Sequence, residues 1–279
     1  MSQRIMTVET LRCYEAWLRE EERSAGTVQK YLRDVRAFAL WLGKGPVTKE
    51  RAAEWKAWLT QRGYASVTVN TKLAALNSFF RCMGWEDCRV RFLKVQRRMF
   101  RDQSRDLTRG EYEKLLAAAR SRERLFLLLE TICSTGIRVS EVRYITLEAV
   151  RAGRAEIALK GKIRTILLPG KLCRKLKKYA QNEKIASGEI FLTGSGKPMS
   201  RQQIWAVMKG LSRQAGVEPS KVFPHNLRHL FATAFYRACR DVVRLADVLG
   251  HSSIETTRIY LLTTGAEHRR QLDKLGLVE

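Results

Sequence analysis

The first 95 residues carry apolar side chains at intervals of three and four, which is the spacing of one face of an α-helix. This pattern predicts four helices, over residues 8–18, 27–43, 50–63 and 66–84. Glycine stands at the end of three of them, at Gly43, Gly63 and Gly84, as is common where a helix stops. Amphipathic helices joined by short loops are typical of a small bundle, so residues 1–95 are predicted to form an N-terminal helical domain.

The pattern changes after residue 95. Residues 96–106 are rich in charge and lack apolar periodicity, which indicates a basic linker before a second domain over residues 107–279. In that domain, Ile and Leu alternate with other residues around a Lys-Gly-Lys break and predict a β-hairpin at 154–170, followed by a short strand at 189–193. The other periodic segments predict helices, over 107–116, 124–136, 171–183 and 200–216, and from His225 to a last short helix at 265–276. The expected fold is mainly α with a small β-sheet: a helical bundle followed by an α+β domain.

The charge of the chain narrows the class of partner. With 52 Lys and Arg against 28 Asp and Glu, the formal net charge of the 279 residues is +24. Such an excess repels itself in a compact fold, so a polyanionic partner is expected. Nucleic acid is favoured over an acidic membrane surface, because no segment has the pattern of a basic helix lying on a membrane. No apolar run approaches the length of about 18 residues that suggests a membrane span, and residues 1–10 lack an apolar signal core.

Six cysteines, at positions 13, 82, 88, 133, 173 and 239, show no Cys-x-x-Cys pairing. Most of them fall within apolar helical patterns. They are therefore predicted to be buried free thiols in a reducing cytosol, rather than disulfides or zinc ligands.

Histidine is concentrated in one part of the second domain, at His225, His229 and His251, and only His268 lies elsewhere. The stretch HNLRH places His225 and Arg228 three residues apart, on one face of a helix. Taken without the other residues, such a pair can have the purely structural role of forming a hydrogen bond with a carbonyl group of the core. His251 in LGH can likewise cap a helix, and His268 is expected to be part of a charged tail helix.

Two further residues extend this set. Arg138 in STGIRVSEV is expected at the start of a helix, and Tyr260 follows LGH after nine residues. Each also has a structural explanation, since an arginine at a helix start can pair with a surface carboxylate and an aromatic ring at helical spacing is often part of a core. The joint occurrence of all these residues in one order favours a functional site.

This order closely resembles the catalytic signature of the tyrosine recombinase (phage integrase-like, Xer-type) family. That signature is Arg in G-x-R, Lys in a β-hairpin, then H-x-x-R, L-G-H and Tyr, and the resemblance covers residues 105–265 approximately. The N-terminal bundle resembles the core-binding domain of the family in its size, helicity and position. The resemblance implies site-specific cleavage and rejoining of duplex DNA through a 3′-phosphotyrosine intermediate.

The resemblance also implies a set of site residues. The catalytic residues would be Arg138, Lys160, His225, Arg228, His251 and Tyr260, with Glu141 and His229 in supporting positions. Tyr260 would attack the scissile phosphodiester and free a 5′-hydroxyl, while Arg138 and Arg228 stabilise the charge on the non-bridging oxygens. His251 would donate a further hydrogen bond to the phosphate, and His225 would accept or orient the tyrosine proton.

The hairpin lysine departs from the family pattern, which usually has Lys-Gly-x-x-Lys around the turn. Here the segment LKGKIRTILLP is one residue shorter. Alignment to Pro169, at the end of the second strand, favours Lys160 over Lys162 as the general acid that protonates the departing 5′-oxygen. Lys162 stays open as the alternative.

The implied partners are double-stranded DNA carrying specific recombination sites and a homotetramer assembled on two duplexes. No cofactor, metal ion, ATP or membrane is expected, and the location would be the cytoplasm of a prokaryote. Basic residues on the second helix, in the linker and in the hairpin are candidate DNA contacts: Lys30, Arg33, Arg36, Arg97, Arg98, Arg101 and Lys162. Two other functions stay open, a type IB topoisomerase that rejoins the original ends and a DNA-binding regulator that does not cut.

Overall fold

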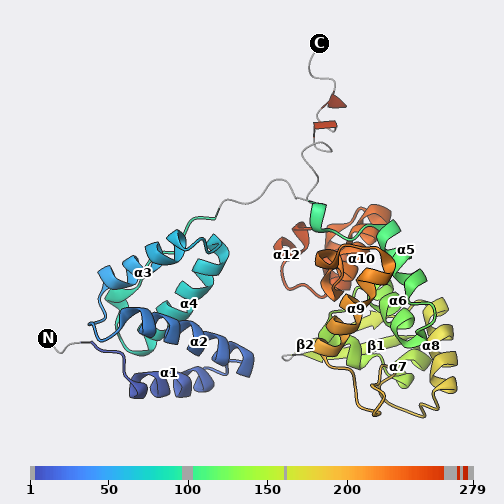
Figure 1. The fold of residues 1–279 in the computed structure, drawn as a ribbon, viewed down its shortest axis with the longest axis horizontal. Coiled ribbons are helices and arrows are strands. Elements are labelled where there is room, and N and C mark those ends of the chain that lie inside the picture. Colours follow the sequence, from blue (N-terminus) through green and yellow to red (C-terminus); the bar gives the residue numbers. More distant parts are fainter. Residues whose placement is uncertain (1–3, 96–102, 160–161, 261–268, 271–272, 276–279) are drawn as a thin grey trace. The chain divides into compact units, whose positions relative to one another are not determined.

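A computed structural model describes residues 4–95, 103–159, 162–260, 269–270 and 273–275 (Figure 1). The chain forms two compact units, Met1–Arg97 and Arg98–Glu279. The fold is mainly helical with one small antiparallel sheet of two strands, β1 (Arg154–Leu159) and β2 (Lys162–Leu167). The predicted fold class is thereby confirmed.

The N-terminal unit contains the four predicted helices: α1 (Val8–Glu20), α2 (Ala25–Leu42), α3 (Lys49–Gln61) and α4 (Ser66–Cys82). A short 3₁₀ turn, η1 (Glu86–Cys88), follows. Aromatic rings fill the core of this unit. The rings of Phe38 and Trp55 meet at 5.1 Å and those of Tyr14 and Phe79 at 5.3 Å, both nearly edge to face, the arrangement that aromatic quadrupoles favour.

The C-terminal unit begins with η2 (Gln103–Arg105), α5 (Arg109–Ala118) and α6 (Glu123–Thr135). A capping box between Thr108 and Glu111 opens α5. The chain continues through these elements: η3 (Val139–Tyr144), α7 (Leu147–Ala152), the β1–β2 hairpin, α8 (Gly170–Asn182), α9 (Arg201–Ala215), η4 (Pro219–Lys221), α10 (Pro224–Cys239), α11 (Val242–Leu249) and α12 (Ile254–Arg258). A core of Leu, Ile and Val side chains lies between the hairpin and these helices, with α10 packed on α6 and α5 on α9.

The hairpin alternates between an inner and an outer face, as expected for strands buried on one side. Ile157 and Ile166 point inward and are buried, whereas Ile163 and Leu167 point outward and are exposed. Arg164 pairs with Ile157 in the antiparallel register. A charged side chain therefore occupies an inward position of β2.

Three predictions from the sequence need comment. The strand predicted at 189–193 is wrong: Glu189 and Leu192 form isolated bridges only, to Thr146 and Pro198. Ile190 and Phe191 are both buried, so this segment is held by the surrounding core and by these single bridges rather than by a continuous ladder. Burial of the thiols is also wrong for Cys13 and Cys239, which are exposed, although Cys88 and Cys173 are buried and all six cysteines are free. Most of the helix predicted at 265–276, including His268, falls outside the described residues.

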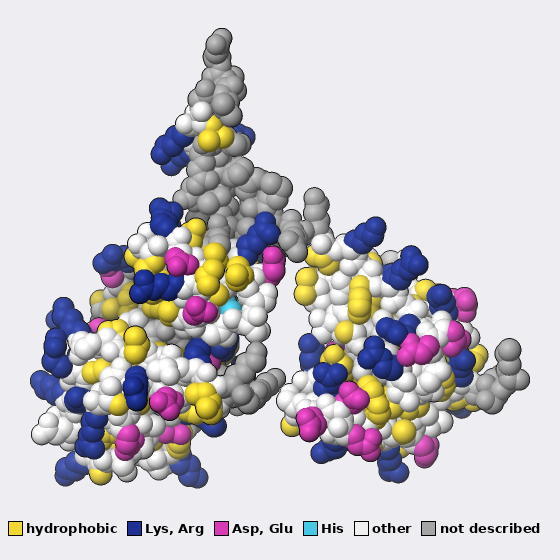
Figure 2. Space-filling view, turned by 180° about the vertical axis from the view of Figure 1, so that it is seen from behind, with side chains coloured by type: hydrophobic (Ala, Val, Ile, Leu, Met, Phe, Trp, Pro, Cys, Tyr) yellow, Lys and Arg dark blue, Asp and Glu magenta, His cyan; other side chains and the backbone are white. Residues whose placement is uncertain are grey.

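Within the part of the chain that the structure describes, no helix has the length and apolar character to span a bilayer. Lysine and arginine side chains are spread over the face of each unit that Figure 2 shows, as the net charge of +24 requires. The predicted DNA contacts Lys30, Arg33 and Arg36 on α2 are exposed, and Arg33 forms an ion pair of 3.1 Å with Asp34.

Candidate active site

The first part of the site follows the end of α6. Gly136 ends this helix with a left-handed φ of +66°, and a Cβ atom there would overlap the ring of Phe231. Arg138 then caps η3, where its backbone N–H donates to Glu141 Oε2 over 2.7 Å and its Nη1 donates to Oε1 over 2.8 Å. Glu141 is buried while the Arg138 side chain is 42% exposed, so the carboxylate holds a guanidinium that still faces solvent.

Arg228 lies on α10 and its side chain is almost fully buried. Its Nη1 donates to the carbonyl oxygen of Gly136 over 2.5 Å, and its Nη2 donates to that of Leu249 over 2.7 Å. Burial, together with the positive charge of Arg138, lowers the pKa of Arg228 to about 10, although the nearby Tyr260 opposes this shift. Arg228 is therefore a desolvated cation fixed by two backbone carbonyl groups, one from each side of the site.

His251 follows α11, which ends at Gly250 with a left-handed φ of +62°. Its Nε2 lies 3.0 Å from Arg228 Nη2 and its Nδ1 lies 2.9 Å from Thr257 Oγ1. Because a guanidinium can only donate, Nε2 accepts and Nδ1 carries the proton. Burial lowers the pKa of His251 to about 4, and the positive charges of Arg228 and Arg138 contribute. In this structure the imidazole is neutral near pH 7.

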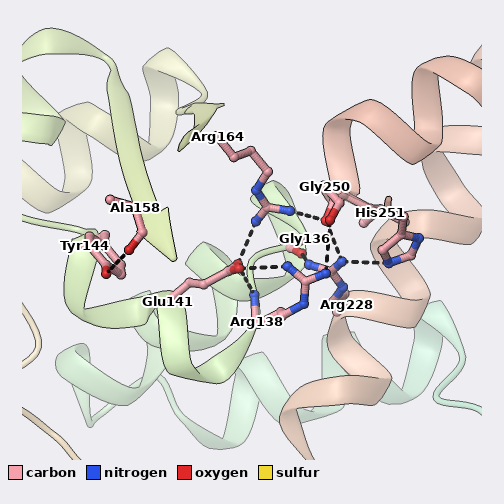
Figure 3. Close-up of polar contacts among 10 residues, drawn as sticks. Gly136, Arg138, Glu141, Tyr144, Ala158, Arg164, Arg228, Gly250 and His251 are labelled. Carbon is pink, nitrogen blue, oxygen red and sulfur yellow. Dashed lines mark hydrogen bonds and ion pairs between the residues drawn. The ribbon is translucent and has the colours of Figure 1, made fainter. Parts of the chain in front are cut away.

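Arg164 joins the same cluster, although the sequence analysis did not select it. Its Nη2 donates to Glu141 Oε2 over 2.6 Å and its Nη1 donates to the carbonyl oxygen of Leu249. Figure 3 shows the guanidinium groups of Arg138, Arg164 and Arg228 together between Glu141 and His251. One carboxylate against three guanidinium groups leaves the cluster positive, which suits a phosphodiester.

Tyr260 lies just after α12 and is only 6% exposed. Its ring stacks on His251 at 6.0 Å with an interplanar angle of 12°, and the ring of His229 lies 4.9 Å away. Tyr260 and His229 line a cavity of about 250 Å³ that also contains Asp106 and Arg237. His229 thus packs beside Tyr260, and both residues border this cavity.

His225 has a different environment. It lies on α10 with Arg228, but its side chain is exposed, and it borders a pocket lined by Trp205 and Phe223. Its charge contributes to the lowered pKa of His251, so the two imidazoles are close enough to interact. The structure therefore brings Arg138, Glu141, Arg228, His251 and Tyr260 together directly, with His225 at the edge of the group.

Several predicted residues cannot be placed. Lys160 lies outside the described residues, as do the linker residues Arg97, Arg98 and Arg101. The backbone of Lys162 opens β2, and its side chain is not among those described.

Two contributing residues, Arg164 and Thr257, were missed. A sequence signal existed for Arg164, because an arginine at an inward position of an alternating strand breaks the expected pattern. For Thr257 no comparable signal exists: its buried hydroxyl meets His251 through the turn that follows Gly250, and the spacing of six residues does not predict this contact.

The chain matches known protein families over both of its units. Residues 105–266 match the Phage integrase family, and residues 11–87 match the Phage integrase, N-terminal SAM-like domain. Tyrosine recombinase XerA of Thermococcus kodakarensis is 30% identical over 97% of this chain and 96% of the relative. Tyrosine recombinase XerD of Xanthomonas axonopodis pv. citri is 32% identical, over 89% of each chain.

A solved structure shares the fold. A lambda integrase tetramer bound to a Holliday junction has a TM-score of 0.72 at 20% identity, covering 90% of this chain and 76% of that one. The match to the integrase family spans more than half of the chain and contains every residue of the cluster around Arg228. The chain belongs to the phage integrase family, together with these tyrosine recombinases.

Proposed function

We propose that this tyrosine recombinase cleaves and rejoins duplex DNA at specific sites with Tyr260 as its nucleophile. The phenolate oxygen attacks the scissile phosphorus and forms a 3′-phosphotyrosine, and the 5′-oxygen leaves. A 5′-hydroxyl from a second duplex then attacks the phosphotyrosine and releases the enzyme, so that the number of phosphodiester bonds is conserved. The observation that carries this proposal is the convergence of Arg138, Arg228 and His251 (Figure 3), together with the stacking of His251 on the Tyr260 ring.

The arginines stabilise the charge that develops on the non-bridging oxygens during both steps. Arg228 is fixed and desolvated before DNA arrives, so it loses little entropy when it meets the phosphate. Arg138 is held by Glu141 at Nη1 and by the carbonyl oxygen of Gly250 at Nη2, over 3.3 Å, and its side chain is still 42% exposed. Because guanidinium groups supply the positive charge, the reaction proceeds without a metal ion, and conservation of the bond energy removes the need for ATP.

The remaining site residues move protons or hold groups in place. His225 accepts or orients the Tyr260 proton, and the hairpin lysine, Lys160, protonates the departing 5′-oxygen. His251 must first lose its bond with Arg228 before its Nε2 can donate to the phosphate. Binding of an anionic phosphate favours this change, because a negative charge beside the imidazole raises its pKa. His229 packs against the Tyr260 ring and supports it.

The two units have different roles on DNA. Residues 1–95 form a core-binding domain that contacts DNA through basic residues such as Lys30, Arg33 and Arg36, residues 96–106 are a basic linker, and residues 107–279 are catalytic. The basic surface supports this proposal. The lambda integrase relative is a tetramer on a Holliday junction, and we propose that this chain likewise forms a homotetramer on two duplexes. A cytoplasmic location stays a prediction.

The test is capture of the covalent intermediate from a pool of nicked duplexes with randomised sequence. Cleavage close to the nick releases a short fragment, so that rejoining is prevented and the protein stays attached to its own preferred site. We expect an adduct that survives SDS and is absent for Tyr260→Phe. A persistent adduct in that variant would refute Tyr260 as the nucleophile, and relaxation of supercoiled plasmids of any sequence would favour the topoisomerase function instead.

A further inference from the structure

Arg164 is a buried cation at a position of β2 where the strand pattern calls for an apolar side chain. It faces inward with Ile157 and Ile166, and its Nε is buried with no hydrogen-bond partner among the described residues. Burial of a guanidinium with an unmet N–H destabilises a fold, and an apolar side chain would avoid that cost. The stability of the hairpin alone therefore does not explain an arginine here.

The contacts of Arg164 suggest why an arginine occupies this position. It shares one acceptor with each of the two arginines that are proposed to bind the phosphate, Arg138 and Arg228 (Figure 3). With Arg138 it shares Glu141 Oε2, which accepts Arg164 Nη2 at 2.6 Å and the Arg138 backbone N–H at 2.7 Å. With Arg228 it shares the carbonyl oxygen of Leu249, which accepts from both guanidinium groups.

We propose that Arg164 is a positioning residue for stabilisation of the transition state, an inference that rests on the proposed function. Arg164 takes up part of the negative charge of Glu141, so that this carboxylate orients Arg138 without neutralising it. Without Arg164, the buried Glu141 would pair with Arg138 alone and withdraw that guanidinium from the phosphate. Arg164 also fixes the Leu249 carbonyl group on which Arg228 rests.

The backbone at Gly250 leaves space for the Arg164 side chain. A Cβ atom at Gly250 would overlap the Cδ and Nη1 atoms of Arg164. The Arg164 side chain on β2 therefore packs directly on the backbone of Gly250, the residue before His251. Through this contact the hairpin that carries the predicted general acid is joined to the segment that carries His251.

The test compares two substrates in each variant by single-turnover cleavage. Both substrates have the sequence that the wild-type protein selects in the capture experiment. One has a normal phosphodiester at the scissile position, and the other has a neutral methylphosphonate at that position. The methylphosphonate lacks the anionic non-bridging oxygen, so its cleavage depends less on correctly placed guanidinium groups. Variants are Arg164→Met and Arg164→Lys, with Arg138→Ala as the reference for a lost phosphate contact. Arg154→Met is the matched control, an exposed arginine on the same hairpin.

We expect Arg164→Met to cleave the phosphodiester about tenfold or more slowly than the wild type, and the methylphosphonate within about threefold of it. Arg164→Lys should fall between the wild type and Arg164→Met, and Arg154→Met should match the wild type. The ratio of the two rates within one variant does not depend on the fraction of folded protein, so a loss of stability cannot imitate this result.

An equal loss on both substrates would overturn the positioning role, and so would an unchanged rate on the phosphodiester. Either result would leave the proposed function standing, because wild-type adduct formation through Tyr260 is measured in the same series. Failure of the wild type to form any adduct would refute the proposed function itself.

Discussion

Arg228 donates a hydrogen bond from Nη2 to Nε2 of His251 across 3.0 Å, and this contact fixes the protonation state of the imidazole. The proton must lie on Nδ1, where the buried hydroxyl of Thr257 accepts it at 2.9 Å. The protein without DNA thus keeps His251 in a form that cannot donate to a phosphate through Nε2. Engagement of the phosphate requires the pair to separate.

The first prediction concerns the charge of His251. Its pKa is lowered from 6.5 to about 4 by burial and by the positive charge of Arg228 and Arg138. Long-range ¹H–¹⁵N NMR of the protein without DNA should therefore show a neutral Nδ1–H tautomer at about pH 6. Thr257→Val should disturb this tautomer, while Thr257→Ser keeps the hydroxyl and should preserve it. Titration of His251 with a midpoint near 6.5 would contradict the assignment.

The same shift has a defined effect on stability. Because the folded-state pKa of His251 lies below the unfolded value of 6.5, the unfolded chain binds the proton first as the pH falls. The contribution of His251 is thus fully present above pH 6.5 and is lost as the pH falls toward 4. Urea unfolding over this window should show a smaller pH dependence for His251→Gln than for the wild type.

The second prediction separates two glycines with similar backbone angles. Gly250 and Gly153 have φ values of +62° and +70°, but a Cβ atom has open space at Gly153 and overlaps Arg164 at Gly250. Gly153→Ala should cost about 1–2 kcal/mol of unfolding free energy, for the left-handed backbone alone. Gly250→Ala should cost about 1–3 kcal/mol more, because the arginine must be displaced. Equal losses in chemical denaturation would show that Arg164 does not pack on Gly250.

The third prediction compares the loss of stability with the loss of cleavage rate at the two arginines proposed as catalytic. Arg138→Ala should lower the cleavage rate by about a hundredfold and the unfolding free energy by less than about 1 kcal/mol, since that side chain is partly exposed. Arg228→Ala should lower the rate at least as much and also destabilise the fold by about 3 kcal/mol, because two carbonyl groups lose a buried donor. Single-turnover cleavage and urea unfolding of both variants provide the measurement. Equal stability of the two variants would contradict the burial of Arg228.

The fourth prediction decides between the two hairpin lysines. Sulfur in place of the 5′-bridging oxygen leaves without a proton, so such a duplex does not need a general acid. Lys160→Ala should cleave the normal duplex slowly and the sulfur duplex at nearly the wild-type rate, while Lys162→Ala should differ little from the wild type on either. The reverse pattern for the two lysines would assign the general acid to Lys162.

The residues of the site differed in how well the sequence predicted them. Arg138, Arg228, His251 and Tyr260 stand in short motifs that resemble the tyrosine recombinase signature, and this resemblance brought them together in one prediction. Arg164 and Thr257 act through contacts between segments far apart or around a tight turn, and such contacts depend on packing that local patterns do not contain.

The same distinction holds for the fold. Helices α1 to α4 follow long apolar periodicity and were predicted, as was the β1–β2 hairpin. The segment at 189–193 was predicted as a strand and is not one. Its consecutive residues Ile190 and Phe191 are buried by the surrounding core rather than by pairing in a sheet, and composition alone does not distinguish these two cases.

The most direct measurement of the central claim is the location and polarity of the covalent bond to DNA. The adduct of the wild-type protein is digested with a protease and a nuclease, and the modified peptide is sequenced by mass spectrometry. The account predicts a nucleotide joined through its 3′-phosphate to the hydroxyl of Tyr260, with a free 5′-hydroxyl on the other strand end. A phosphate on any other residue, or a link through a 5′-phosphate, would contradict it.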